Sequence, residues 1–356
     1  MAERQSSRPS RREVLRLAGF TAGSAVGFGL IGSAGAKFLA DALGITSPDI
    51  TPRLPFSNEL SYELRNSFSV TSQDTGQDVN IIFANRRQYF EGKPVIITSG
   101  GWGSYNQRGI DQRSTGWLAY VTNHPVIRFD YIGVGGSDDL DSMQEESLHD
   151  GVLDETVKPV LGAISQFYLP GRRGYRVQVE RAFIAAVSMG ASAGSLVLKY
   201  APKYRIQVER GVEVEPVGVD NLTELYKKFV SEKSFKPDTE EGFDLKEAFR
   251  QFMEFIHFGV DLGKNNAYFS YVPALSRKFV PSAFDEALRE NNRLILLGGS
   301  GSESKVCPLN PTEQMVASLA AAYPGRVSWD VFEGLSHDVF ARTSWSKYVD
   351  KKIQRV

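Results

Sequence analysis

The sequence predicts an α/β fold in which helices flank a mostly parallel central sheet. Segments typical of strands alternate with segments typical of helices from about residue 62 to the C-terminus. Two of the strand segments, residues 94–98 and 293–297, are nearly continuous apolar runs, as expected for strands buried within a sheet. This alternation favours parallel strands that are joined by helical crossovers.

The composition is that of an ordinary globular protein with a large core. The chain has 356 residues, of which 42% are hydrophobic, and its net charge is -1. This charge, and the lack of a basic stripe with interleaved aromatic residues, argue against a nucleic-acid partner. The single cysteine, Cys307, excludes an internal disulfide and a metal site built from several cysteines. We expect no metal and no cofactor.

The N-terminal segment differs in kind from the rest of the chain. Arg11 and Arg12 precede a glycine- and alanine-rich apolar stretch at residues 17–36, and small residues suit a signal peptidase that cuts before Lys37. The segment resembles a twin-arginine signal, which implies a bacterial protein that the twin-arginine export machinery delivers to the periplasm or the medium. No stable membrane span is then expected after cleavage, whereas an uncleaved segment would be long enough to anchor the chain.

The first elements of the alternation lead to a glycine-rich loop. Residues 62–70 and 79–83 alternate apolar and polar side chains, which predicts an opening hairpin with its turn at residues 73–76. The buried strand at residues 94–98 then runs into Ser-Gly-Gly-Trp-Gly at residues 99–103. The glycines of this loop allow backbone N–H groups to turn toward a bound ligand.

The next strand, residues 126–129, ends at a turn that is rich in glycine and acidic residues. Residues 130–138 lack the lysine of a phosphate loop, and their carboxylates do not have the spacing of a calcium loop. We therefore expect a structural turn there. A helix predicted over residues 148–167 leads to a strand at residues 181–185, and a second helix ends near Tyr200.

The C-terminal part of the pattern repeats the same alternation. Strands are predicted at residues 212–217, 293–297 and 327–332, and the second of them ends in a glycine- and serine-rich loop at residues 298–303. Asn310 is followed by proline and, two residues later, by glutamate. This context predicts a helix that Asn310 caps and that stops at a Pro-Gly pair.

Two serines compete for the position of a nucleophile where the strand at residues 181–185 gives way to a helix. Residues 190–194 read Gly-Ala-Ser-Ala-Gly and match G-x-S-x-G literally, with Ser192 at the centre, whereas Ser188 matches only if Ala186 replaces the first glycine. Since the strand ends before Ala186, Ser188 falls on the strand-to-helix turn and Ser192 falls one turn into the helix. The position favours Ser188. The alternative is that small residues merely let the helix pack closely on the sheet.

From about residue 62 onward, the sequence resembles the α/β-hydrolase superfamily. Four motifs occur in the order of that family, namely the glycine loop, the acidic turn, the serine turn at Ser188 and the late histidine His337. The resemblance implies an α/β-hydrolase fold with a helical lid, similar to esterases and proline aminopeptidases. It divides the chain into a signal at residues 1–36, a hydrolase core at 37–220 and 293–356, and a lid at 221–292.

The resemblance also assigns catalytic roles. It implies that Ser188 is the nucleophile, because the family's serine is commonly followed by methionine, glycine and small residues, as here. It implies that His337 is the base, since this histidine lies on the loop after the last predicted strand. The implied oxyanion donors are the amides of Met189 and of Gly101 or Trp102.

The third member of the triad is where the sequence departs from the family's pattern. An aspartate usually follows the strand that corresponds to residues 293–297, but Glu303 is the only acid in this loop. Glutamate is an accepted alternative in this fold, so we expect Glu303 to orient the histidine. Asp220, which follows the preceding strand, is the alternative, and a solvated loop carboxylate is the other interpretation of Glu303.

These features predict an exported serine hydrolase that cleaves a carboxylic ester or a related acyl compound through an acyl-enzyme. Aromatic residues between positions 249 and 271 favour an apolar small-molecule acyl substrate, unless they form the lid's own core. A proline-aminopeptidase-like serine peptidase is the alternative, since Glu240 or Glu241 can capture a peptide amine. A non-catalytic binding protein on the same fold is the third hypothesis.

Overall fold

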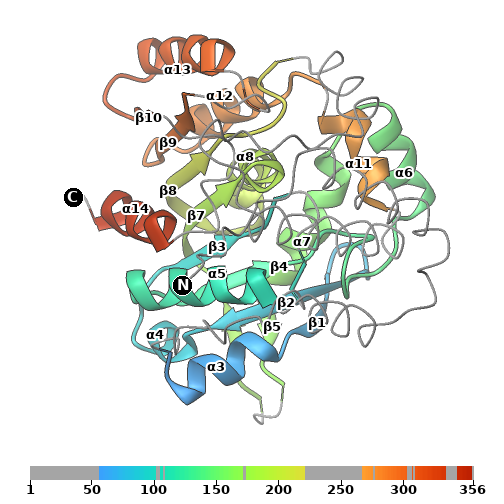
Figure 1. Ribbon diagram of the computed structural model, residues 1–356. Helices are drawn as coiled ribbons and strands as arrows, with labels where there is room; N and C mark the ends of the chain where they lie inside the picture. The colour runs from blue at the N-terminus through green and yellow to red at the C-terminus, as the bar shows by residue number, and fades with distance from the viewer. Residues whose placement is uncertain are drawn as a thin grey trace, which may run out of the picture. The chain divides into compact units, whose positions relative to one another are not determined.

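The computed structural model (Figure 1) describes residues 56–101, 105–106, 109–170, 174–220, 267–275, 277–302, 307, 309–333 and 343–354. The predicted signal at residues 1–36 lies outside these described residues, and so does most of the predicted lid. Three predicted site residues, Trp102, Glu303 and His337, also lie outside them.

An eight-stranded sheet forms the centre of the described chain, with the strand order β1-β2-β4-β3-β7-β8-β9-β10. The pairs β1–β2 and β2–β4 are antiparallel, and all other neighbouring pairs are parallel. The prediction of a mostly parallel central sheet is therefore confirmed. The strands span Phe68–Thr71 (β1), Asp78–Ala84 (β2), Val95–Thr98 (β3), Val126–Phe129 (β4), Arg181–Val187 (β7), Gln207–Val214 (β8), Ile295–Gly301 (β9) and Val327–Phe332 (β10).

Two hydrophobic cores lie on opposite faces of this sheet, because side chains alternate between the faces along each strand. In β7, Ile184 and Ala186 belong to the first core, whereas Phe183 and Ala185 belong to the second. Helices cover both faces (Figure 1). The first core includes residues of α7 (Asp154–Ser165), α8 (Met189–Tyr200), α12 (Val280–Glu290) and α13 (Leu309–Ala322), and the second includes residues of α3 (Asn58–Arg65), α5 (Gly109–Thr122) and α14 (Thr343–Gln354).

Two predicted elements of the N-terminal half are divided differently in the structure. The helix predicted over residues 148–167 is two helices, α6 (Ser142–His149) and α7, which Gly151 separates with a φ of 81°. Residues 62–65 were expected in a strand but form the end of α3, whose N-terminus Ser57 caps. The hairpin of β1 and β2 is confirmed, and its turn includes Gly76 at a φ of 74°.

The predicted strand ends also shift near the carboxyl edge of the sheet. β8 ends at Val214, three residues before the predicted end, because Glu215 adopts a φ of 50° that is incompatible with a strand. β9 continues to Gly301, so residues that were expected in a glycine-rich loop belong to the sheet. A Cβ on Gly298 would lie 2.1 Å from the ring of Trp329, which explains a glycine within this strand.

The remaining described elements are short or lie at the margins of the two cores. A separate sheet pairs β5 (Gln166–Tyr168) with β6 (Arg176–Gln178). The helix α13 begins at Leu309, so Asn310 lies in its first turn and does not cap it. Further helical elements are α4 (Arg86–Phe90), α11 (Ala267–Leu275) and the short 3-10 helix η2 (Ala201–Tyr204).

The described part of the predicted lid consists of α11 and α12. Val280, Phe284 and Leu288 of α12 belong to the first core, and α12 packs against α8. Lid boundaries at residues 221 and 292 stay a prediction.

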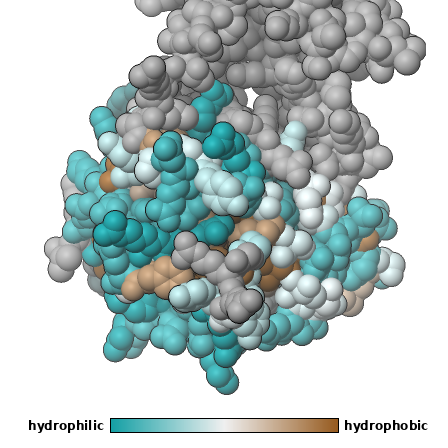
Figure 2. All heavy atoms as spheres, turned by 90° about the horizontal axis from the view of Figure 1, so that it is seen from below, coloured by the Kyte–Doolittle hydropathy of each residue, from teal (hydrophilic) through white to brown (hydrophobic). Residues whose placement is uncertain are grey.

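No helix in the described ranges is both long enough and apolar enough to cross a membrane. The face seen in Figure 2 is mainly hydrophilic among the described residues, and its hydrophobic atoms gather in a few limited areas.

Candidate active site

Ser188 occupies a strained turn between the central strand β7 and the helix α8. β7 ends at Val187, α8 begins at Met189, and Ser188 between them has φ 54° and ψ -127°. This conformation is rare for a residue with a side chain, and it is typical of functional sites where the surroundings hold it. The Ser188 N–H donates to the carbonyl of Val214 on β8 at 3.0 Å, which ties the turn to the sheet. The predicted strand-to-helix position of Ser188 is confirmed.

The small residues around Ser188 are required by the close approach of the glycine loop. A Cβ on Gly190 would lie 2.6 Å from the carbonyl oxygen of Ser99 and 2.9 Å from that of Gly100. Both contacts are with backbone, which cannot move aside easily, so a larger residue at position 190 would displace the loop. Ala186 is buried in the first core, where alanine replaces the motif's first glycine.

Ser192, the centre of the literal motif, lies inside α8, as predicted. Its side chain is fully buried, and its hydroxyl donates to the carbonyl of Val217 at 2.6 Å and lies 3.2 Å from the carbonyl of Ser188. The hydroxyl therefore fastens the helix to the segment that follows β8. This contact gives Ser192 a structural role.

The glycine loop lies directly beside Ser188. A Cβ on Gly101 would lie 3.4 Å from Cβ and 3.7 Å from Oγ of Ser188, so the two residues are in contact across the turn. The buried hydroxyl of Tyr131 donates to the carbonyl of Gly100 at 3.0 Å and lies 3.2 Å from Oγ of Ser99. Burial raises the pKa of Tyr131 well above its usual value, so the hydroxyl keeps its proton and holds the loop.

The N-terminus of α8 supplies positive electrostatic potential at the same place. Met189 is the first residue of this helix of 12 residues, and the first amides of a helix have no intrahelical partner. The helix dipole adds a partial positive charge at this end. The Met189 amide and the Gly101 backbone therefore lie where they can stabilise negative charge near Ser188.

The structure shows a buried carboxylate that the sequence analysis missed. Glu215 follows β8 directly and is fully buried, and its Oε1 accepts a hydrogen bond from the Gly301 N–H at 2.7 Å. The predicted strand over residues 212–217 placed Glu215 inside a strand, so it was not considered as a loop residue. Asp220, the alternative predicted acid, is exposed. Glu303 and His337 are not among the described residues.

A second buried carboxyl group, that of Glu213 on β8, lies under the nucleophile helix. Both of its oxygens lack a hydrogen-bond partner within the described part of the chain, and burial raises its pKa well above the usual value. A Cβ on Gly194 would lie 2.5 Å from Oε1 of Glu213, so the carboxyl group packs directly on α8. Burial therefore favours the protonated form of Glu213.

The acidic turn after β4 is held together by one carboxylate. The buried side chain of Asp130 accepts hydrogen bonds from the Asn106 N–H and Asn80 Nδ2, both at 2.6 Å, and from the Gly136 N–H at 3.2 Å. Burial raises the pKa of Asp130 to about 6, against the effect of these donors. Asp130 thus has a structural role, and it fixes Asn106 just beyond the glycine loop. The described residues include no cluster of three His, Cys, Asp or Glu side chains suited to a metal ion.

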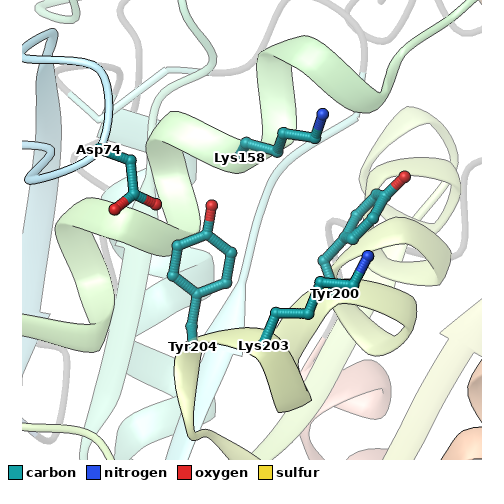
Figure 3. A pocket seen from close by; sticks show the side chains of 5 residues that line it. All are labelled: Asp74, Lys158, Tyr200, Lys203 and Tyr204. Carbon is teal, nitrogen blue, oxygen red and sulfur yellow. The ribbon is translucent and has the colours of Figure 1, made fainter.

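A pocket of about 310 Å³ lies at the C-terminal end of α8, the end opposite to Ser188. Figure 3 shows the side chains that line it. In Figure 3 the carboxylate of Asp74 faces the hydroxyl of Tyr204, and Lys203 lies beside the ring of Tyr200. The Nζ of Lys203 is 4.8 Å from the centre of that ring. Lys158 completes the lining. The pocket has mixed charges and contains no nucleophile poised by a base.

No known family model and no curated protein matches the sequence. The chain is similar in structure to an esterase from Pyrococcus furiosus, with 14% identity, a TM-score of 0.54, and coverage of 84% of this chain and 95% of the esterase. It is also similar to the enol-lactonase from Burkholderia xenovorans, with 15% identity, a TM-score of 0.53, and coverage of 82% of this chain and all of the lactonase. The strand order and these likenesses agree with the fold that the sequence predicts: the chain has the α/β-hydrolase fold.

Proposed function

We propose that the protein is a serine hydrolase that cleaves a carboxylic ester or a related acyl compound through an acyl-enzyme, with Ser188 as nucleophile. The observation that carries this proposal is the strained turn at Ser188, which puts one serine at the N-terminus of α8 and in contact with Gly101. Strain of this kind persists only where the surroundings enforce it, and here it exposes a hydroxyl to a set of backbone donors.

The chemistry assigns a separate task to each group. A serine hydroxyl is a poor nucleophile at neutral pH, so His337, five residues beyond the end of β10, accepts its proton as general base. Attack on the acyl carbon gives a tetrahedral intermediate, whose oxyanion is stabilised by the amide of Met189 and by that of Gly101 or Trp102. His337 then protonates the leaving group, and water releases the acyl-enzyme by the reverse sequence.

The carboxylate behind His337 has three candidates in this proposal. Glu303 and Asp220 follow from the sequence, and Glu215 follows from the structure. A carboxylate in this role holds the imidazole in the correct tautomer and stabilises the imidazolium that forms.

The proposal places the protein outside the bacterial cytoplasm. Its support is the twin-arginine pattern at Arg11 and Arg12, followed by an apolar stretch and a small-residue cleavage site. The twin-arginine export machinery is then a partner during export, and the substrate is a small acyl compound, of which an apolar one suits the aromatic residues of the lid segment.

A peptidase and a binding protein are the alternatives to an ester hydrolase. A proline-aminopeptidase-like peptidase would use the same nucleophile and would capture a free amine with a lid acid such as Glu240 or Glu241. A non-catalytic binding protein would keep the fold without the chemistry. The solved structures of similar fold are named for esterase and lactonase activity, which makes an oxygen ester the first substrate class to test.

Steady-state hydrolysis distinguishes the three functions. We expect the purified protein to hydrolyse p-nitrophenyl butyrate, and Ser188→Ala to abolish this activity, whereas Ser192→Ala retains it if the protein folds. Faster cleavage of proline p-nitroanilide than of the ester would favour the peptidase. Absence of hydrolysis with a panel of acyl esters and anilides would favour the binding protein.

A further inference from the structure

We infer that Glu215 is the carboxylate that positions the catalytic histidine. This inference rests on the proposed serine hydrolase, and it names Glu215 as a positioning residue that acts on substrate only through His337. It replaces Glu303 and Asp220, the two acids that the sequence suggested.

Glu215 and Ser188 occupy equivalent positions at the carboxyl edge of neighbouring strands. Val187 is the register partner of Val214 in the parallel pair β7–β8, and Ser188 and Glu215 are the residues that follow them. The Ser188 N–H donates to the Val214 carbonyl, so the two chain ends are joined by a hydrogen bond at this edge. The nucleophile and the carboxylate therefore leave the sheet side by side.

The side chain of Glu215 extends from β8 to β9. Its Oε1 is held by the N–H of Gly301, the last residue of β9, at 2.7 Å. The neighbouring Ser302 N–H donates to Phe332 of β10, so the Gly301 N–H faces β8 and the carboxylate lies between β8 and β9. Since strands in a sheet are about 4.8 Å apart, it lies roughly one and a half strand spacings, about 7 Å, across the sheet from the backbone of Ser188. An imidazole that bridges a hydroxyl and a carboxylate through two hydrogen bonds of about 2.8 Å each fits a gap of this size.

The residue that holds the carboxylate pairs with the strand that precedes the histidine in the sequence. Gly301 is the register partner of Phe332, the last residue of β10. His337 follows Phe332 by five residues, a length of chain that can return across β9 toward the Glu215 carboxylate. Along this edge of the sheet, Ser188 follows β7, Glu215 follows β8, Gly301 ends β9 and Phe332 ends β10.

The backbone of Glu215 is held as firmly as its carboxylate. Its N–H donates to the Gly299 carbonyl at 3.0 Å, and its own carbonyl accepts a hydrogen bond from Sγ of Cys307 at 3.0 Å. These bonds maintain a left-handed φ of 50° at a residue with a long side chain. Such a conformation persists where the surroundings impose it, as they also do at Ser188.

The other described acids of this region do not share this placement. Asp220 is exposed and lies five residues beyond Glu215. Glu213 is on the same strand, but its carboxyl group packs on Gly194 of α8, below the edge. Glu215 alone, among the described acids near Ser188, combines full burial with a backbone donor at the carboxyl edge.

Substitution of Glu215 by Gln tests the inference in the full-length protein with p-nitrophenyl butyrate as substrate. Gln keeps an oxygen that can accept the Gly301 N–H, so the fold is retained while the charge is lost. We expect kcat to fall by about 10³-fold with KM nearly unchanged. We also expect the acid limb of the kcat/KM profile to move to lower pH, because the imidazolium loses a neighbouring negative charge.

Four further variants complete this test. Glu303→Gln and Asp220→Asn remove the competing acids, and we expect less than about threefold change in kcat for each. Glu209→Gln removes a partly exposed carboxylate from the same strand, where Glu209 pairs with Arg181 at 2.7 Å, and it serves as the matched control. If Glu215→Gln does not fold, Glu215→Asp decides, since a carboxylate withdrawn by one methylene should lower kcat about 10- to 100-fold without moving the acid limb.

The inference is overturned if Glu215→Gln retains kcat within threefold and an unchanged acid limb, or if Glu303→Gln or Asp220→Asn shows the large loss instead. Full kcat in Glu215→Asp, when the Gln variant is unfolded, would overturn it as well. These results leave Ser188 as nucleophile intact. Failure of the proposed function is recognised separately, by ester hydrolysis that persists in Ser188→Ala or is absent from the wild type.

Discussion

The two ends of the helix α8 differ in almost every physical respect. At its N-terminus, Ser188 is strained and nearly buried, and glycines allow backbone segments to touch. At its C-terminus, about 18 Å away, Tyr200 is also buried, but Lys199 is partly exposed and Lys203, just beyond the helix, is exposed. The more open end contains the pocket of about 310 Å³, and the more closed end contains the candidate chemistry.

The two ends also differ in how their charged groups are paired. Lys199 lies 3.0 Å from Glu286 and 3.5 Å from Asp154, and Tyr200 donates to Asp154, so the C-terminal charges are paired with one another. Cations at a helix C-terminus also complement its dipole. Backbone strain, by contrast, occurs at the N-terminal end, where Ser188 has a φ of 54°. An open pocket is therefore a poorer guide to the reactive site in this chain than backbone strain is.

The largest effect of a single added methyl group is expected at Gly190. Gly190→Ala would put a Cβ within 2.6 Å of the Ser99 carbonyl and push the glycine loop away from Ser188. We expect ester hydrolysis to fall by about 100-fold, because misplacement of a catalytic group by about 1 Å has that effect. Urea unfolding should show a loss of about 1–3 kcal/mol.

Gly194→Ala is the matched control for this prediction, because it adds the same methyl group to the same helix. Its Cβ meets the carboxyl group of Glu213 at 2.5 Å, away from the glycine loop. We expect a comparable loss of stability with kcat retained within about threefold. Equal loss of activity in both variants would show that the glycine loop has no special sensitivity.

The next largest effect is expected in the acidic turn after β4, where the Tyr131 hydroxyl donates to the Gly100 carbonyl of the glycine loop. Asp130→Asn replaces one carboxylate oxygen by an amide NH₂, which then faces either the Asn106 N–H or the donors of Asn80 and Gly136. We expect the free energy of unfolding to fall by about 1–3 kcal/mol, as for an unsatisfied buried polar group. Unchanged stability in chemical denaturation would mean that the turn does not depend on this carboxylate.

The effect of Glu213 depends on pH. Because its pKa is raised in the folded protein, its contribution to stability is present below the pKa of the unfolded chain and is lost as the pH rises through the folded pKa. Glu213→Gln cannot ionise, so we expect it to gain stability relative to the wild type at alkaline pH, by about 1–3 kcal/mol. Thermal unfolding of both proteins between pH 5 and about pH 9 measures the difference. Parallel curves would contradict a raised pKa of Glu213 in the folded protein.

The smallest effects are expected at the C-terminal end of α8. Lys203→Ala and Tyr204→Phe change the lining of the open pocket, and each removes a group that is partly exposed or solvated. We expect kcat to stay within about twofold and stability within about 0.5 kcal/mol, as for ordinary surface substitutions. A tenfold loss of activity in either variant would overturn the contrast between the two ends.

The sequence predicted the sheet because many of its strands are short apolar runs, such as β4, which is buried throughout and has its predicted bounds. The edge strand β10 also has its predicted bounds, although it is only partly buried. It also predicted the position of Ser188, since the end of β7 and the start of α8 are both visible in the spacing of apolar residues. The predicted end of β8 was wrong, because the residue types at positions 212–217 give no local signal of the left-handed backbone at Glu215.

The reason for that backbone lies in another strand. The N–H of Gly301 and the carbonyl of Gly299 hold Glu215, and both belong to a stretch that was expected to be a loop. The two errors are therefore connected. The predicted strand ends placed β8 too far along the chain and ended β9 too early, and both concealed the contact between Glu215 and the end of β9. Long-range hydrogen bonds of this kind have no periodic signature in a single sequence, which is why the acid was sought in Glu303 and Asp220.

The central claim is that Ser188, at the strained end of α8, is the nucleophile. It is tested most directly by reaction of the purified protein with a fluorophosphonate, followed by peptide mapping in a mass spectrometer. We expect one phosphonyl adduct on Ser188, formed also in Ser192→Ala and absent from Ser188→Ala. An adduct on Ser192, or labelling that survives Ser188→Ala, would contradict it.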